Sequence, residues 1–78
     1  MSVELRLYPL RRTSIRDTLK IVRELRKSKI VRKQTIFDLE VNGFDEWTIL
    51  VTSDYDEVGQ EVIGYAQDHP GLLEVTTV

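Results

Sequence analysis

Cysteine is absent from this chain of 78 residues, and histidine and tryptophan each occur once. Without cysteine the chain can form no disulfide, no thiolate metal site and no cysteine nucleophile. The single histidine, His69, stands beside Pro70 at a predicted helix end, where it is placed to contact the last helical carbonyls rather than to act as a base. The sequence also has no Gly-rich nucleotide motif, serine elbow or calcium-loop pattern. We therefore predict a protein that is not an enzyme and that holds no metal and no cofactor.

Basic residues are absent from the second half of the chain. All eleven Lys and Arg lie in residues 1–33 beside three acids, whereas residues 34–78 hold ten acids and no base. The local balances are +8 and −10, although the net charge is only −2. A charge asymmetry of this kind indicates either a charged partner or a self-complementary assembly.

Long hydrophobic runs are absent as well. No apolar stretch approaches the roughly 18 residues of a membrane span, and residues 1–4 show no signal-peptide pattern, so we expect a cytoplasmic protein with no membrane partner. The contents of 41% apolar and 31% charged residues are typical of one globular domain, which we assign to residues 1–78. A chain this short buries only about 60% of its unfolded surface. Because small domains often gain stability by self-association, we expect a homo-oligomer, a dimer or larger.

The first half of the chain predicts a strand, a helix and a second strand. Alternating apolar residues from Val3 predict a strand that ends at Pro9, because proline has no N–H to give to a central ladder. Ser14 is placed to cap a helix that closes at Lys29, with an acid three residues after the cap. We expect its buried stripe to comprise Ile15, Leu19, Val22 and Leu25, flanked by Thr18 and Ile21. Residues 30–41 are predicted to form a long strand.

The second half predicts a hairpin, a helix and a last strand. Asn42-Gly43 is a strong hairpin-turn signal, and the following strand spans residues 46–52. An odd-length loop would pair Leu39 with Trp47, Phe37 with Ile49 and Thr35 with Val51, which keeps apolar groups on one face. Ser53 or Asp54 is placed to cap a second helix that His69-Pro70-Gly71 stops, and residues 72–78 form the last strand. The expected buried stripe of this helix is Val58, Val62, Tyr65 and Ala66.

This order of elements, βαββαβ, predicts an α+β fold of the ferredoxin-like type. Two right-handed crossovers around a central hairpin give a four-stranded antiparallel sheet in the spatial order 4-1-3-2, with both helices on one face.

Two family resemblances accompany this fold. The segment Val3-Glu4-Leu5-Arg6-Leu7-Tyr8-Pro9-Leu10 resembles the first strand of the thiamine-binding ferredoxin-like family, in which that strand often ends in a similar Tyr-Pro-Leu. The pattern of elements over the whole chain is similar to ACT-type regulatory domains, which bind small metabolites between subunits. Both resemblances imply a non-catalytic, oligomeric, ligand-binding module.

The predicted helices carry opposite charges on their exposed faces. The first exposes Arg16, Lys20, Arg23 and Lys27, and the second exposes Asp56, Glu57, Glu61 and Asp68. These faces can compensate each other within one molecule, through pairs worth about 0–1 kcal/mol each. Alternatively, the basic helix of one subunit meets the acidic helix of another, which would make assembly sensitive to salt. A third interpretation is a nucleic-acid or phosphate contact formed by Arg12, Arg16, Lys20 and Arg23.

The face of the sheet away from the helices carries more apolar residues than a solvated surface requires. We predict that Ile36, Leu50 and Val78 contribute to a subunit interface on this face. For a small or anionic regulatory ligand bound at such an interface, the predicted contacts are Tyr8, Arg11, Arg12 and Arg16. The leading hypothesis is therefore a non-enzymatic, self-associating domain, and the alternative is a nucleic-acid or phosphate binder that uses the basic first helix.

Overall fold

Four strands and three helices alternate along the described residues of this computed structural model, which are residues 2–10, 14–43 and 46–78. In chain order they are β1 (Val3–Pro9), α1 (Ile15–Leu25), α2 (Lys29–Gln34), β2 (Ile36–Gly43), β3 (Glu46–Ser53), α3 (Asp56–Asp68) and β4 (Leu73–Thr77). The α+β class predicted from the sequence is therefore confirmed. The predicted number of two helices is wrong, because the described residues include a third helix, α2, that was not expected from the sequence.

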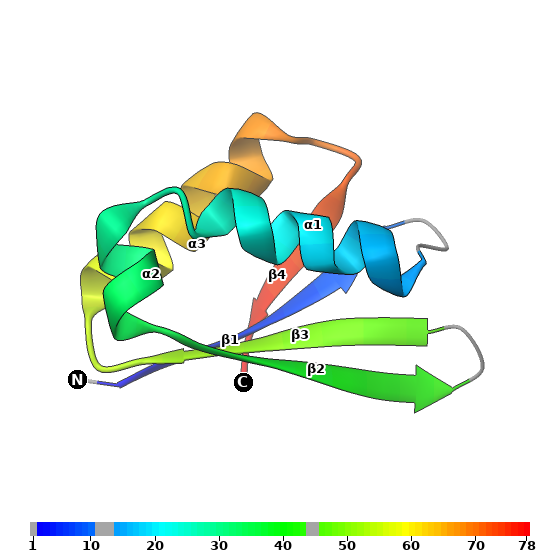
Figure 1. Cartoon of the computed structure of the whole chain (residues 1–78), viewed down its shortest axis with the longest axis horizontal. Coiled ribbons are helices and arrows are strands. Elements are labelled where there is room, and N and C mark those ends of the chain that lie inside the picture. Colours follow the sequence, from blue (N-terminus) through cyan, green and yellow to red (C-terminus); the bar gives the residue numbers. More distant parts are fainter. Residues whose placement is uncertain (1, 11–13, 44–45) are drawn as a thin grey trace.

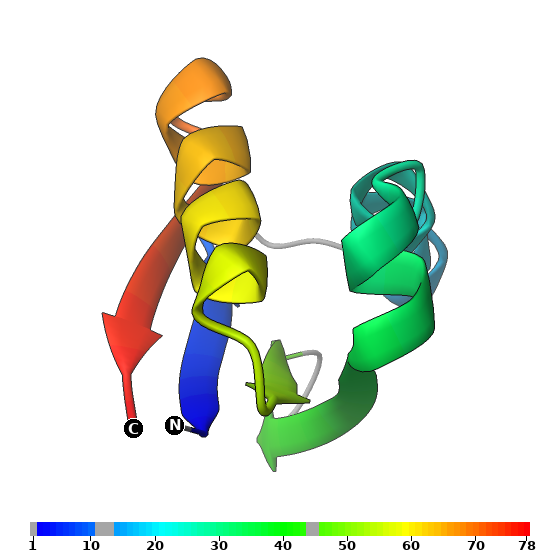
Figure 2. The same cartoon turned by 90° about the vertical axis from the view of Figure 1, so that its left-hand side faces the viewer.

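The strands form one antiparallel sheet in the order β2-β3-β1-β4, which read from the β4 edge is β4-β1-β3-β2. The three helices cover one face of this sheet and leave the other face open (Figure 1). Helix α3 lies over β1 and β4, whereas α1 and α2 lie one after the other over the β2 side (Figure 1 and Figure 2). The layers therefore place the basic and the acidic helices next to each other, as expected from the sequence.

The core lies between the sheet and the helices. In β1, Leu5 and Leu7 are buried and their neighbours Arg6 and Tyr8 point to the open face, which is the period-two pattern of a half-buried strand. The buried apolar set comprises Leu5, Leu7, Ile21, Val22, Leu25, Val31, Ile49, Val51, Val58, Val62 and Leu73.

Helix α1 begins where the sequence predicts. The Asp17 backbone N–H donates to the Ser14 hydroxyl oxygen at 3.2 Å, which confirms the Ser14 cap. The predicted buried stripe is wrong in its first half, because Ile15 and Leu19 are 44% and 46% exposed. The helix packs instead through Thr18, Ile21, Val22 and Leu25, a stripe rotated about the helix axis relative to the predicted one.

Residues 29–34 are helical, so the long strand predicted for residues 30–41 is wrong in its first part. Val31, which is completely buried, anchors the short helix in the core, while Lys29, Arg32 and Lys33 are exposed at helical spacing. The β-branched pair at positions 30 and 31 favours a strand locally, and the tertiary contact of Val31 overrides that preference.

The hairpin between β2 and β3 keeps the predicted faces but not the predicted register. Leu39 lies opposite Ile49 and Phe37 lies opposite Val51, so the pairing is shifted by two residues from the prediction. A shift of two preserves the side of the sheet on which each residue lies. The difference arises because Asn42 and Gly43 belong to β2, where the register shifts, and do not form the turn.

Helix α3 packs closely on β1 through a glycine. A Cβ atom at Gly59 would lie 3.3 Å from the Val3 Cγ1 atom, so this position keeps the helix near the strand. The predicted side-chain cap is wrong, because Tyr55 is the N-cap residue and makes no such bond. The Ser53 hydroxyl instead donates to the Gln34 carbonyl at 2.6 Å and accepts from the Tyr55 N–H at 3.1 Å, which ties α2 to the start of α3.

Candidate functional site

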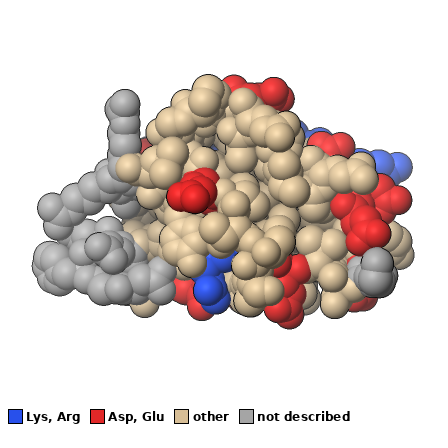
Figure 3. All heavy atoms as spheres, turned by 180° about the vertical axis from the view of Figure 1, so that it is seen from behind, with Lys and Arg blue, Asp and Glu red and all other residues tan. Residues whose placement is uncertain are grey.

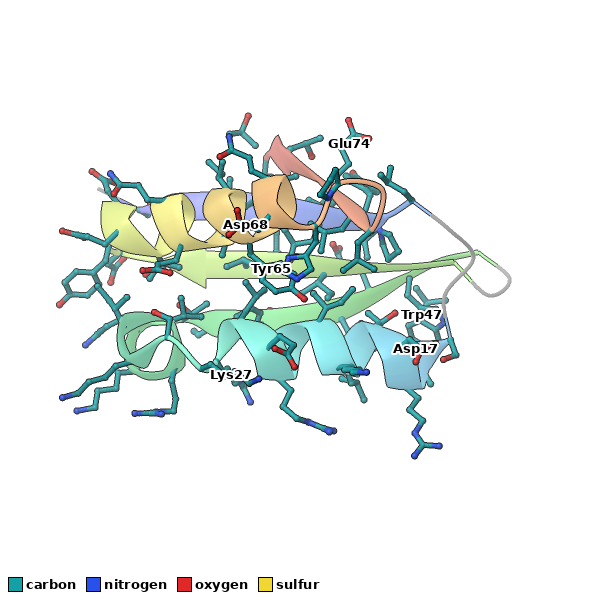
Figure 4. The ribbon with its side chains drawn as sticks, turned by 90° about the horizontal axis from the view of Figure 1, so that it is seen from above. Asp17, Lys27, Trp47, Tyr65, Asp68 and Glu74 are labelled. Atoms are coloured by element: carbon teal, nitrogen blue, oxygen red, sulfur yellow. The ribbon has the colours of Figure 1, made fainter. Side chains whose placement is uncertain are left out.

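Exposed bases gather on the outer side of α1 and α2. We call this the basic surface, and it comprises Arg16, Lys20, Arg23, Lys27, Lys29, Arg32 and Lys33. On α1 these bases recur every three or four residues, opposite the buried stripe through Thr18 and Leu25. Figure 4 shows long side chains that end in nitrogen projecting from α1 and α2 on the side away from α3. The folding of residues 29–34 into α2 enlarges a basic face that the sequence assigned to one helix.

Among the described residues, only one of these bases forms an ion pair. Lys27 Nζ lies 3.0 Å from Glu24 Oε2 in an exposed pair, and hydrogen bonding to Lys27 is the main reason why the pKa of Glu24 falls below its ordinary value. Arg26, beside the basic surface, stacks over the Phe37 ring with its Cζ atom 5.3 Å from the ring centroid. Within the described part of the chain, the other six bases of the basic surface form no ion pair.

A groove of about 470 Å³ runs between the C-terminal end of α1 and helix α3. We call it the acidic groove because its lining includes four carboxylates and no base: Glu24, Leu25, Ser28, Glu57, Gln60, Glu61, Gly64, Tyr65 and Asp68. In Figure 4, Tyr65 comes from α3 and lies toward α1, and Lys27 lies across from it, just after the end of α1. The arrangement favours a cationic partner that also contacts the apolar parts of Leu25 and Tyr65.

Tyr65 lines this groove and is partly buried. Burial is the first cause that raises the pKa of Tyr65 above its ordinary value, and the nearby Glu24 carboxylate is the second. The His69 ring stacks on the Tyr65 ring with the centroids 4.2 Å apart, and His69 Nδ1 lies 2.9 Å from the Tyr65 carbonyl oxygen. His69 therefore has the role at the helix end that the sequence predicts.

The side of the molecule formed by α3 and β4 is acidic. In Figure 3 this side shows acidic groups at several separate places and very few basic ones. The exposed acids of α3 are Asp56, Glu57, Glu61 and Asp68. The opposite charges of the sequence halves thus become opposite sides of the folded molecule.

The open face of the sheet is a grid of three rows that each cross all four strands. Taken from β2 to β4, the rows are Ile36, Thr52, Glu4 and Val78; then Asp38, Leu50, Arg6 and Thr76; then Glu40, Thr48, Tyr8 and Glu74.

The grid separates the predicted interface residues. Ile36 and Val78 are 64% and 62% exposed, but they occupy opposite ends of one row, about 14 Å apart at the usual spacing between strands. Arg6 and Leu50 lie in the middle of the next row. Arg6 Nε lies 3.1 Å from Glu40 Oε1, and hydrogen bonds to Tyr8 and then to Glu40 raise the pKa of Arg6. The apolar residues of this face therefore do not form one patch, and their role as an interface stays a prediction.

The predicted ligand residues are not assembled by the described chain. Tyr8 lies on the open face of the sheet, whereas Arg16 lies on the first turn of α1, on the other side of the sheet. Arg11 and Arg12 lie outside the described residues. Sequence reasoning did not find the acidic groove or the contribution of α2 to the basic surface, although the bases at positions 29, 32 and 33 have the spacing of a helix face.

Two further properties bear on function. Among residues 2–10, 14–43 and 46–78, no three histidine or carboxylate side chains are grouped so that they could hold a metal ion. No helix in the same residues has the length and apolar character needed to cross a membrane.

Comparison with known proteins gives no relative from which a role could be transferred. No protein family, no curated protein and no solved structure matches the chain significantly. The resemblances to the thiamine-binding and ACT-type families therefore have no support beyond the small α+β architecture.

Proposed function

We propose that this chain is a non-enzymatic domain that self-associates, with the basic surface of one copy bound at the acidic groove of another. The observation that carries the proposal is the separation of charge in the folded molecule. Six bases that form no ion pair among the described residues lie on the outer side of α1 and α2, and four carboxylates without a base line the groove beside α3. Apart from the Lys27–Glu24 pair, no ion pair among the described residues joins these two surfaces within one molecule.

The geometry of this assembly follows from the use of two different surfaces. An interface between unlike surfaces is heterologous, so repeated contacts build a ring or an open filament rather than a closed two-fold dimer. Exposed ion pairs are individually weak, and salt screens them. We therefore expect weak, concentration-dependent association that high salt reverses.

The proposal extends to the fold type. We propose a ferredoxin-like domain in which α2 is an addition between α1 and β2. The element order and the sheet order with β1 and β3 in the centre support this assignment. A small anionic ligand at the subunit interface remains part of the hypothesis, with Tyr8, Arg11, Arg12 and Arg16 as its predicted contacts.

Light scattering on the purified chain at low and at high salt tests the proposal. We expect a mass above that of the monomer at low salt and the monomer mass at high salt. Glu57→Lys with Glu61→Lys should give a monomer at both, because the groove then has no net charge and no longer attracts the basic surface. An oligomer that survives high salt would instead favour the open sheet face with Ile36, Leu50 and Val78. A monomer throughout would refute self-association.

A further inference from the structure

The six unpaired bases of the basic surface form two regular rows. Arg16, Lys20 and Arg23 follow one face of α1, and Lys29, Arg32 and Lys33 lie on α2. With a rise of 1.5 Å per residue, the row on α1 extends over about 10 Å. Phosphates of one nucleic-acid strand follow each other about every 3.4 Å along a duplex axis, so this row can reach roughly three of them.

Few acids oppose an anion on these helices. The described residues of α1 and α2 include only Asp17 and Glu24 as acids. Glu24 lines the acidic groove and is paired with Lys27. Asp17, two helical turns before Glu24, lies on the same side of α1 and therefore beside the row of bases rather than within it. An approaching polyanion thus meets bases first.

The composition of the basic surface also indicates how an anion would be bound. Residues 14–34 contain no aromatic side chain, so the surface offers no platform on which the nucleobases of a single strand could stack. Contacts from Arg and Lys to phosphates supply affinity but carry no direct information on base identity. These properties favour a duplex backbone over a single strand.

We propose that the basic surface binds the phosphate backbone of a nucleic-acid duplex without sequence preference. This inference goes beyond self-association, and it uses the same residues. A duplex and a second copy of the chain therefore exclude each other, and duplex binding should dissociate the oligomer. Arg12, which the sequence analysis included among the nucleic-acid contacts, lies outside the described residues and is not needed here.

The test is fluorescence anisotropy with labelled short RNA and DNA duplexes of two unrelated sequences, titrated with the full chain. Six phosphate contacts predict that the logarithm of the binding constant falls with the logarithm of salt concentration with a slope of roughly −5. Between about 50 and 200 mM salt this slope corresponds to a loss of about 1,000-fold in affinity. The two sequences should bind equally well, because phosphate contacts do not depend on sequence.

Two double variants with the same net charge show whether duplex binding depends on the basic surface itself or only on the total charge of the chain. Arg23→Gln with Arg32→Gln removes two proposed contacts and should make the slope shallower by about 2. Ile63→Glu with Gln67→Glu changes the net charge by the same amount at exposed positions of α3 outside the acidic groove, and we expect it to keep most of the affinity. The groove variant with Glu57→Lys and Glu61→Lys should still bind the duplex even though it no longer self-associates. Because the groove variant should lose self-association but keep duplex binding, the two proposals can fail independently of each other.

Several results would overturn the inference. The first is the absence of saturable binding to any duplex at about 50 mM salt, where phosphate contacts are strong. An equal loss of affinity in the α3 variant would show a general charge effect. Tighter binding to single strands than to duplexes would refute the backbone geometry, and binding only to phosphatidylserine-containing vesicles would assign the surface to a membrane.

Discussion

Gly59 and Gly64 of α3 form a matched pair, because a methyl group added at each position would have different surroundings. A Cβ atom at Gly64 would have no heavy atom within 4 Å, whereas one at Gly59 would lie 3.3 Å from Val3 Cγ1. Both positions lie in the interior of the same helix, so replacing either glycine by alanine gains about 1 kcal/mol of helix propensity.

Gly64→Ala should keep this gain in full, and a domain of this size should then melt about 4–8 °C higher. Gly59→Ala should gain less, because the new methyl displaces Val3 and moves α3 away from β1. Thermal and urea denaturation followed by circular dichroism measure both differences at the same protein concentration. If Gly59→Ala stabilises the protein as much as Gly64→Ala, the close contact between α3 and β1 is wrong. If Gly64→Ala destabilises it, the open surroundings of that position are wrong.

Three other predictions test local parts of the fold. Val31→Ala should destabilise the protein by about 1–3 kcal/mol in urea denaturation, whereas the neighbouring exposed change Lys33→Ala should stay within about 0.5 kcal/mol; equal effects would contradict helix α2. Ser14→Ala should cost about 1 kcal/mol through loss of the α1 cap, and Ser14→Gly only a few tenths, which the same assay checks. The pKa of Glu24 is lower in the folded state than its ordinary value, so the charged carboxylate stabilises the folded state at pH values above that ordinary pKa. This contribution is lost as the pH falls through the pKa that Glu24 has in the folded state. In an NMR titration, Lys27→Ala should therefore move the Glu24 pKa back upward, and an unchanged value would show that the pair does not persist in solution.

The strands that alternate strictly could be predicted from the sequence. Leu5 and Leu7 are buried as the pattern of β1 requires, and Phe37 and Leu39 lie on the helix side of the sheet as expected. The cap at Ser14 could be predicted as well, because a short polar side chain at a helix start satisfies the N–H groups of the first turn by a purely local interaction.

The parts that the sequence did not predict depend on long-range contacts. Residues 29–34 have strand-forming residues in their centre, and only the burial of Val31 against the rest of the core determines that they are helical. The register of the hairpin depends on the irregularity between Val41 and Gly43, which no local pattern indicates. The acidic groove requires α1 and α3 to lie side by side, so its residues come from segments more than thirty positions apart.

The charge pattern was visible in the sequence, but its consequence depends on the fold. The basic and acidic halves could have compensated each other along the two helices. In the structure, Lys27 in the turn after α1 pairs with Glu24 of α1, and the long side chains of α1 and α2 project on the side away from α3 (Figure 4). The described residues therefore leave both charges available to partners outside the molecule.

Mixing two variants that each weaken one of the two surfaces tests self-association most directly. Lys20→Glu with Arg23→Glu lowers the charge of the basic surface from +7 to +3 and keeps the acidic groove, whereas Glu57→Lys with Glu61→Lys neutralises the four negative charges of the groove and keeps the basic surface. In sedimentation velocity at low salt, we predict a monomer for each variant alone and an associated species for the equimolar mixture, because the intact basic surface of one variant then meets the intact acidic groove of the other. If the mixture stays monomeric while the unchanged chain associates, the basic surface and the acidic groove are not the partners.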